Sequence, residues 1–185
     1  PDLFLHLGDW TYPDHAYYPG KPTQNNHRFF VANQEQIKES FIIRYNLPNM
    51  KNMLSTTAVD YVFDDEDGIW DDFSKHSYCD LQLINGKIVV KEIPFADSLR
   101  DNLLTSYHQY FPAYTNQKKP KEAFHSFIYG NTEVFFLDTR STRSPNSEVF
   151  HQNKKGIWKF KASANHQILD SIQLDWLLNG LKNLE

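Results

Sequence analysis

The stretch Leu3-Phe4-Leu5-His6-Leu7-Gly8-Asp9-Trp10-Thr11-Tyr12 decides the fold prediction. Its first five residues are an apolar run typical of a buried strand, and Gly8 lets the backbone turn sharply before Asp9. A carboxylate that follows such a strand lies at the sheet edge where α/β proteins bind ligands. Asp9 offers the hard oxygen that Ca, Mg, Mn or Fe prefers, and Tyr12 could bring its phenol to the same point. The alternative is an Asp that caps a turn and a Tyr that packs on it.

A second apolar strand, predicted over 58–63, runs into the acidic stretch Asp64-Asp65-Glu66-Asp67. Asp71 and Asp72 follow closely. Carboxylates packed this densely repel one another unless a cation neutralises them. The pattern favours a metal-binding edge, and a solvated acidic loop is the alternative.

A third strand delivers Leu137-Asp138-Thr139-Arg140-Ser141-Thr142-Arg143. Arg140 and Arg143 could form a fork for phosphate oxygens, since guanidinium groups bind such oxygens in pairs. An Asp138–Arg salt bridge that holds the loop is the alternative.

The remaining pattern predicts mixed α/β structure in one domain segment over 1–185. Helical spacing and capping signals predict helices over 34–42, 48–56, 97–110 and 168–181. Asn85-Gly86 and Gly130-Asn131 predict hairpins that pair 81–84 with 87–90 and 123–129 with 133–137. Polar and Pro-rich composition predicts long loops over 10–33 and 139–165.

Composition excludes several classes of protein. The 185 residues are 40% hydrophobic and 23% charged, which excludes wholesale disorder. Lys and Arg number 19 against 23 Asp and Glu, and the net charge of −4 argues against nucleic acid as the main partner. Cys79 is the sole cysteine, so no intrachain disulfide and no Cys-based zinc site can form. No apolar run approaches the roughly 18 residues of a transmembrane segment. The chain begins at Pro1 without an initiator Met, and we expect it to be a piece of a longer polypeptide.

Four segments in this order resemble the alkaline phosphatase D (PhoD-like) metallophosphatase family. Residues 5–12 are similar to its GDxxY segment, and Val62-Phe63-Asp64-Asp65-Glu66-Asp67 is similar to its W-D-D-H-D/E segment. The stretch from Phe124 through Arg143 is similar to the family's LDxRsyR region, and Gln173-Leu174-Asp175-Trp176-Leu177 to its Q..WL helix.

The resemblance implies a metal-dependent phosphomonoesterase or phosphodiesterase that uses a metal-activated water. It implies a two-sheet β-sandwich flanked by helices, incomplete in this chain because the family's first strand precedes Pro1 and its histidine-bearing strands follow Glu185. Divalent metal, expected to be calcium, and iron are the implied cofactors. The implied metal ligands are Asp9, Asp64, Asp65 and Tyr12, with the Tyr12 phenolate on iron. Arg140, Arg143 and His15 are expected to contact the phosphate ester, and the family is mostly exported.

One departure from the family is expected to affect activity. Glu66 stands where the family has a histidine that contacts phosphate or protonates the leaving group. A carboxylate there repels a phosphate dianion unless it is protonated or holds a metal, and His76 is a candidate substitute. The alternative is a non-catalytic relative that acts as a binding or structural module. A carbohydrate- or surface-binding protein, suggested only by the 15% aromatic content, is a third possibility.

Overall fold

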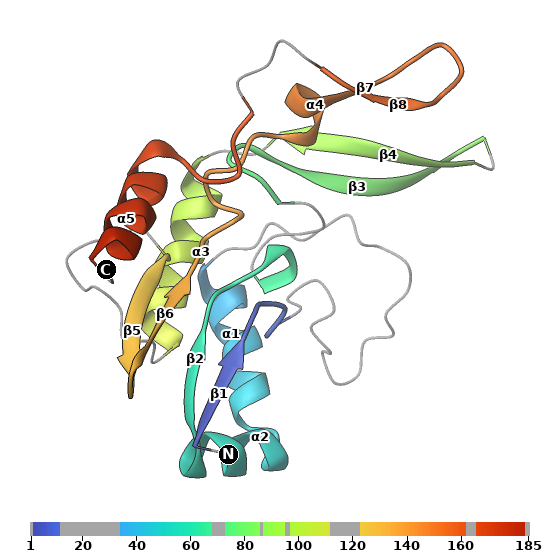
Figure 1. Ribbon diagram of the computed structural model, residues 1–185. Coiled ribbons are helices and arrows are strands. Elements are labelled where there is room, and N and C mark those ends of the chain that lie inside the picture. The colour runs from blue at the N-terminus through green and yellow to red at the C-terminus, as the bar shows by residue number, and fades with distance from the viewer. Residues whose placement is uncertain are drawn as a thin grey trace.

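The computed structural model describes residues 2–11, 34–67, 73–85, 87–94, 97–111, 123–161 and 166–183. Figure 1 shows the elements in these ranges. The strands are β1 (Leu3–His6), β2 (Ala58–Tyr61), β3 (Ser77–Ile84), β4 (Lys87–Pro94), β5 (His125–Tyr129), β6 (Thr132–Phe136), β7 (Phe150–Gln152) and β8 (Trp158–Phe160). The α-helices are α1 (Gln34–Tyr45), α2 (Pro48–Thr56), α3 (Asp97–Tyr110), α4 (Asn146–Val149) and α5 (Ser171–Lys182), and a short 3₁₀-helix spans Asp65–Asp67.

The parallel pair of β1 and β2 positions the candidate site. Leu3 pairs with Ala58 at one end and His6 with Tyr61 at the other. Because the strands are parallel, their carboxyl ends lie at the same edge, with Gly8 and Asp9 after β1 and the acidic stretch after β2. The structure therefore brings the two acidic strand ends to one edge of the strand pair.

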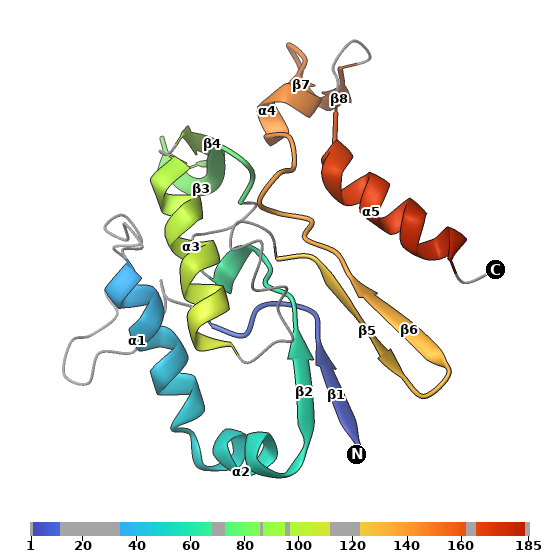
Figure 2. The same ribbon diagram turned by 90° about the vertical axis from the view of Figure 1, so that its left-hand side faces the viewer.

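An aromatic core supports this strand pair. Trp10, Tyr61, Phe63, Tyr107 and Phe111 are all buried and belong to one cluster. The Tyr107 hydroxyl donates to the Tyr61 carbonyl at 2.5 Å, which ties α3 to the end of β2. Figure 2 shows α1 and α3 on one side of the strands and α5 on the other. Much of the high aromatic content therefore serves as core volume.

The β5–β6 hairpin and α5 form a second packed unit. The Trp176 ring lies 4.8 Å from that of Phe124 and 5.5 Å from that of Phe135, centroid to centroid. The described strands pair as β1–β2, β3–β4, β5–β6 and β7–β8. This confirms mixed α/β structure, and the complete two-sheet sandwich stays a prediction.

The expectation of an irregular loop over 139–165 was wrong. This segment contains α4 and the β7–β8 hairpin, in which Phe150 pairs with Phe160 and Gln152 with Trp158. The strands are only three residues long, so their alternation was too brief to be recognised in the sequence.

Several predicted boundaries also shifted. α5 begins at Ser171 because the Asp170 side chain caps it and accepts the Gln173 N–H at 2.9 Å, so Ile168 lies before the helix. The first hairpin is longer than predicted and extends over Ser77–Pro94. Within the described residues, no helix is long and apolar enough to cross a membrane.

Candidate functional site

The ends of β1 and β2 approach so closely that only glycine fits between them. Gly8 has φ +107°, and a Cβ added to it would lie 2.2 Å from the Asp64 Cβ. Asp9 follows with φ 57°, a left-handed conformation that Asp tolerates better than most residues. This backbone directs the first predicted metal ligand toward the second strand end.

Asp67 holds the two strand ends together. Its Oδ2 accepts the N–H groups of Asp9 at 2.8 Å and Asp64 at 2.7 Å, and its Oδ1 accepts the Thr11 N–H at 2.8 Å. The Thr11 hydroxyl also donates to the Asp67 carbonyl at 2.8 Å. Burial raises the pKa of Asp67 to about 7, although the hydrogen bonds from the backbone N–H groups of Asp64 and Thr11 oppose the shift. In the sequence Asp67 is one member of an acidic cluster, and no local pattern indicates this positioning role.

Three of the predicted metal ligands come together. One carboxylate oxygen from each of Asp9, Asp64 and Asp65 lies within 4.8 Å of the others, and all three residues are half-buried. The Asp65 N–H also donates to Asp64 Oδ1 at 2.9 Å, which fixes the start of the 3₁₀-helix. Hard oxygen donors at this spacing fit a divalent cation such as Ca²⁺ or Mg²⁺.

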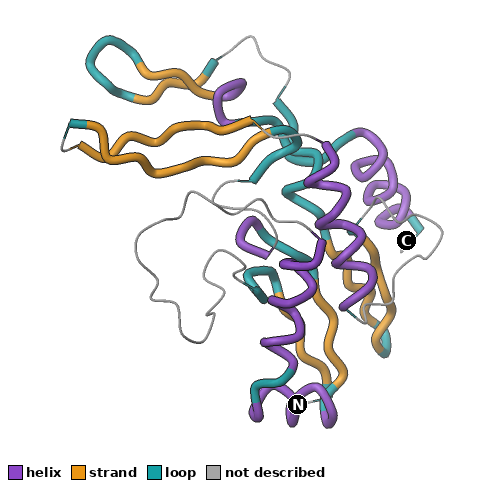
Figure 3. The backbone as a smooth tube through the Cα atoms, turned by 180° about the vertical axis from the view of Figure 1, so that it is seen from behind, coloured by secondary structure: helices purple, strands orange, loops and turns teal. Residues whose placement is uncertain are grey.

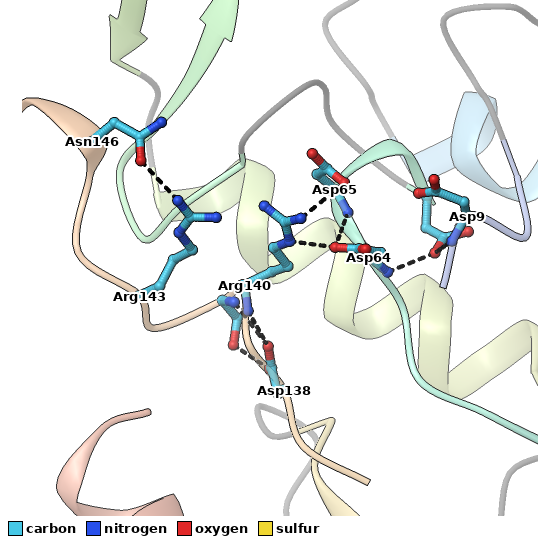
Figure 4. A network of polar contacts seen from close by, with 9 residues as sticks. Asp9, Asp64, Asp65, Asp138, Arg140, Arg143 and Asn146 are labelled. Atoms are coloured by element: carbon cyan, nitrogen blue, oxygen red, sulfur yellow. Dashed lines mark hydrogen bonds and ion pairs between the residues drawn. The ribbon is translucent and has the colours of Figure 1, made fainter. Parts of the chain in front are cut away.

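Arg140 reaches the same carboxylates from the loop after β6 (Figure 4). Its Nε donates to Asp64 Oδ1, and its Nη2 lies 3.2 Å from Asp65 Oδ1. The guanidinium therefore partly neutralises the acidic group and lies beside the candidate metal site.

Asp138 builds the turn that presents Arg140. Its Oδ1 accepts the N–H groups of Arg140 at 3.0 Å and Ser141 at 2.9 Å, and its Oδ2 accepts the Ser141 hydroxyl. Burial raises the pKa of the Asp138 carboxyl despite these hydrogen bonds. The Asp138–Arg salt bridge of the alternative therefore takes a different form: Asp138 holds the backbone of the turn, and the Arg140 side chain pairs with Asp64 and Asp65.

Arg143 extends differently from Arg140. Its Nη2 donates to the Asn146 side-chain oxygen at 2.8 Å at the start of α4, as Figure 4 shows. The backbone of the same residue accepts the Lys75 N–H at 3.1 Å. The two arginines therefore follow one turn, but in this conformation only Arg140 is directed at the acidic group.

The other predicted site residues are less informative. Tyr12 and His15 lie outside the described residues, and Glu66 is described only as backbone within the 3₁₀-helix. His76 is exposed, and its Nδ1 lies 3.1 Å from Asp97 Oδ1 at the start of α3. The structure gives His76 a surface contact with Asp97.

A buried polar pair escaped the sequence analysis. His125 Nε2 lies 2.9 Å from Asp60 Oδ1, and His125 Nδ1 lies 2.9 Å from the Ala123 carbonyl oxygen. The one signal for this pair in the sequence is Asp60, a charged residue within an otherwise apolar strand. No signal linked it to His125, because 65 residues separate the two.

Comparison with known proteins identifies the family. The family model described as PhoD-like phosphatase matches residues 1–185, the whole chain. The chain belongs to the PhoD-like phosphatase family. The resemblance drawn from the four sequence segments is therefore confirmed.

A solved structure described as "Structure of PhoD" has a similar fold, with a TM-score of 0.64 and 17% sequence identity. The match covers 97% of this chain and 34% of that chain. The PhoD-like chain thus spans about a third of the length of the structure that it matches. No curated protein matches it significantly.

Proposed function

We propose that this protein hydrolyses phosphate monoesters or diesters with a metal-activated water at the joined ends of β1 and β2. The observation that carries the proposal is the close grouping of Asp9, Asp64 and Asp65, to which Arg140 adds a cationic side chain. Membership of the PhoD-like phosphatase family supports phosphate esters as the substrate class.

Asp9, Asp64 and Asp65 would hold the divalent cation, for which calcium is our first choice. Tyr12 would supply a phenolate to iron, as the family resemblance implies. Such cations, when bound, lower the pKa of water and neutralise phosphate oxygens. Gly8 and Asp67 act as positioning residues, since they fix the approach of the two ligand-bearing strand ends.

Hydrolysis forms a bond from the water oxygen to phosphorus and breaks the ester P–O bond, while the leaving oxygen takes up a proton. Arg140 would stabilise the charged phosphoryl oxygens, because its guanidinium already lies at the edge of the carboxylate group. Arg143 and His15 are proposed as further substrate contacts. Glu66 occupies the position of the family's histidine and would supply the proton only in its protonated form.

The second candidate function is that of a non-catalytic relative that keeps the fold as a binding or structural module. The specific observation that favours it is Glu66 in place of histidine. In either case the family resemblance supports export from the cytoplasm, which we include in the proposal.

The test is to measure hydrolysis of a nitrophenyl phosphate and a bis-nitrophenyl phosphate by the full-length protein. Activity should disappear on chelation and return with Ca²⁺, with or without Fe. Asp9→Asn should lower metal content and the rate at least about 100-fold while the fold survives, since a hard anionic ligand is replaced by a neutral amide of similar shape.

Asp175→Asn is the matched control, because Asp175 is exposed on α5. It should leave rate and metal content unchanged. Turnover that survives complete metal removal would contradict the proposal. Absence of metal and of turnover in the unmodified protein would favour the non-catalytic module.

A further inference from the structure

The β7–β8 hairpin presents a large apolar surface to solvent. Phe150, Trp158 and Phe160 have exposed fractions of 40%, 54% and 60%, and Ile157 beside them is 56% exposed. Phe150 and Phe160 are register partners, and Gln152 opposite Trp158 completes the same face of the two strands. An aromatic face this exposed marks an interaction surface.

The same segment is strongly basic. Between Glu148 and Asp170 the chain contains four lysines and no acidic residue, although the whole chain has a net charge of −4. The lysines are Lys154, Lys155, Lys159 and Lys161. The charge of this hairpin is therefore opposite to that of the molecule and complementary to an anionic surface.

The basic and aromatic side chains occupy different parts of the hairpin. Lys154 and Lys155 occupy the turn, and Lys159 pairs with His151 on the face opposite the aromatic rings. Lys161 instead donates to the Ser147 carbonyl and fastens the hairpin to α4. Aromatic side chains on one face, with lysines at the tip and on the reverse face, are typical of protein segments at the membrane–water interface, where the rings lie at head-group depth.

The turn is pre-ordered for contact. The Asn153 side-chain oxygen accepts the N–H groups of Lys155 at 2.9 Å and Ile157 at 3.0 Å. The Asn153 N–H donates to the Ile157 carbonyl at 2.9 Å, and Gly156 supplies the positive φ of 75°. The tip is therefore ordered before it binds, which reduces the entropic cost of binding.

The hairpin also projects from the body of the protein. Figure 3 shows the two hairpins, labelled β7–β8 and β3–β4 in Figure 1, extending in the same direction, away from α3 and α5. The tip of β3–β4 adds another exposed aliphatic residue, Ile84. Two projecting tips with aliphatic side chains suit shallow insertion into a flat surface.

We propose that the β7–β8 hairpin is a peripheral docking surface for an anionic lipid bilayer, with its aromatic face at the depth of the head groups. Single-stranded nucleic acid is bound by stacking of bases on aromatic rings, to which an aliphatic side chain does not contribute. The exposure of Ile157 beside the rings therefore favours a lipid surface. The proposal is independent of the proposed phosphoesterase activity.

The test is flotation of the full-length protein with phosphatidylcholine vesicles that contain or lack phosphatidylglycerol. Binding should require the anionic lipid and weaken as salt rises. Each lysine near an anionic surface contributes about fivefold to partitioning, so Lys154→Gln with Lys155→Gln should reduce it about 25-fold. Lys51→Gln with Lys182→Gln, which removes two exposed charges elsewhere, is the matched control and should change partitioning less than about twofold.

Insertion of the aromatic face is tested separately. Trp158 fluorescence should be quenched by brominated lipid, and Trp158→Ala with Phe160→Ala should lower partitioning at least about tenfold. Ile128→Ala on β5, at a position that is 74% exposed, is the control and should have no effect. Failure to bind anionic vesicles, binding unaffected by the hairpin variants, or a preference for single-stranded nucleic acid would each overturn the proposal.

Discussion

At the scale of single residues, Arg140 has the most to contribute to the candidate site. It joins the carboxylates of Asp64 and Asp65 from a separate part of the chain. In the absence of metal its charge offsets the repulsion between those groups, but a bound cation would compete with it for the same oxygens. Stability without metal and affinity for metal are therefore expected to change in opposite directions when Arg140 is removed.

We predict that Arg140→Ala lowers the free energy of unfolding of the metal-free protein by about 1–2 kcal/mol and raises metal affinity several-fold. The two effects are measured by urea unfolding and by calorimetric titration with Ca²⁺. Arg100→Ala is the matched control, since Arg100 has a similar side-chain exposure of 18% against 16% and pairs with Asp101 at 3.4 Å. Weaker metal binding in Arg140→Ala would show that Arg140 supports the metal site and does not compete for it.

Glu66 is the residue that should set substrate preference. A carboxylate about 5 Å from a second negative charge costs on the order of 3 kcal/mol at an effective dielectric constant of about 20. A monoester dianion should suffer more than a diester monoanion, so we predict weak activity biased toward diesters. Glu66→His should raise the monoester rate relative to the diester rate.

The measurement is the ratio of kcat/KM for the two nitrophenyl esters, with metal content determined in parallel. Glu39→His, an exposed position on α1, is the control and should leave the ratio unchanged. A fall in both metal content and rate would indicate that Glu66 is itself a metal ligand. No change in either quantity would place Glu66 outside the site.

At the scale of elements, the close approach of two strand ends depends on Gly8. An added Cβ would meet the Asp64 side chain at 2.2 Å and the Asp64 backbone nitrogen at 2.8 Å, and φ is +107°. Gly130 offers a comparison, because its φ is also positive at +63° but, apart from its chain neighbours, no atom lies within 4 Å of its added Cβ.

We predict that Gly8→Ala destabilises the protein by at least about 3 kcal/mol, since the steric overlap adds to the cost of the left-handed backbone. Gly130→Ala should cost only about 1–2 kcal/mol, the backbone contribution alone. Urea unfolding measures both values. Equal destabilisation by the two substitutions would show that β1 and β2 can separate at Gly8.

The sequence predicted the elements that depend on local patterns. The Asn85-Gly86 turn, the capped helices and the acidic strand ends were recognisable because a few neighbouring residues determine each of them. The parallel pairing placed Asp9, Asp64 and Asp65 together as expected from the position of polar residues at strand ends.

What the sequence did not predict depends on contacts between distant residues. Asp67 binds backbone N–H groups more than 50 residues away, and Arg140 reaches Asp64 across 76 residues. The sequence does not show whether a given acidic or basic side chain binds an ion, a backbone group or solvent. The short β7 and β8 strands gave too little alternation to be distinguished from a loop.

At the scale of the whole molecule, the buried pair of Asp60 and His125 links β2 to the β5–β6 hairpin. Both side chains are almost completely excluded from solvent. The Ala123 carbonyl can only accept a hydrogen bond, so His125 Nδ1 carries a proton, and Nε2 faces the Asp60 carboxylate. The Phe136 ring stacks on the imidazole at 5.0 Å, and the pair thereby joins the strand that carries the candidate ligands to the strands that lead to Arg140.

This pair should make stability depend on pH. Burial by itself would lower the pKa of His125, but the hydrogen bonds to Asp60 and Ala123 and the charge of Asp60 outweigh it, so the pKa is raised above its usual 6.5. The folded state therefore holds this proton more tightly than the unfolded state. The resulting stabilisation is fully present below about pH 6.5 and is lost as pH rises through the raised pKa.

We predict that His125→Gln lowers the free energy of unfolding by about 3 kcal/mol at pH 6, because Asp60 loses its charged partner in a buried position. The difference from the unmodified protein should shrink as pH rises above 6.5, and urea unfolding at several pH values measures it. His76→Gln is the control, since His76 pairs with Asp97 on the exposed surface and its loss should cost less than about 1 kcal/mol. A deficit in His125→Gln that stays constant from pH 6 to pH 9 would mean that His125 is neutral in the folded protein, and the link between β2 and β5 would then be an ordinary hydrogen bond.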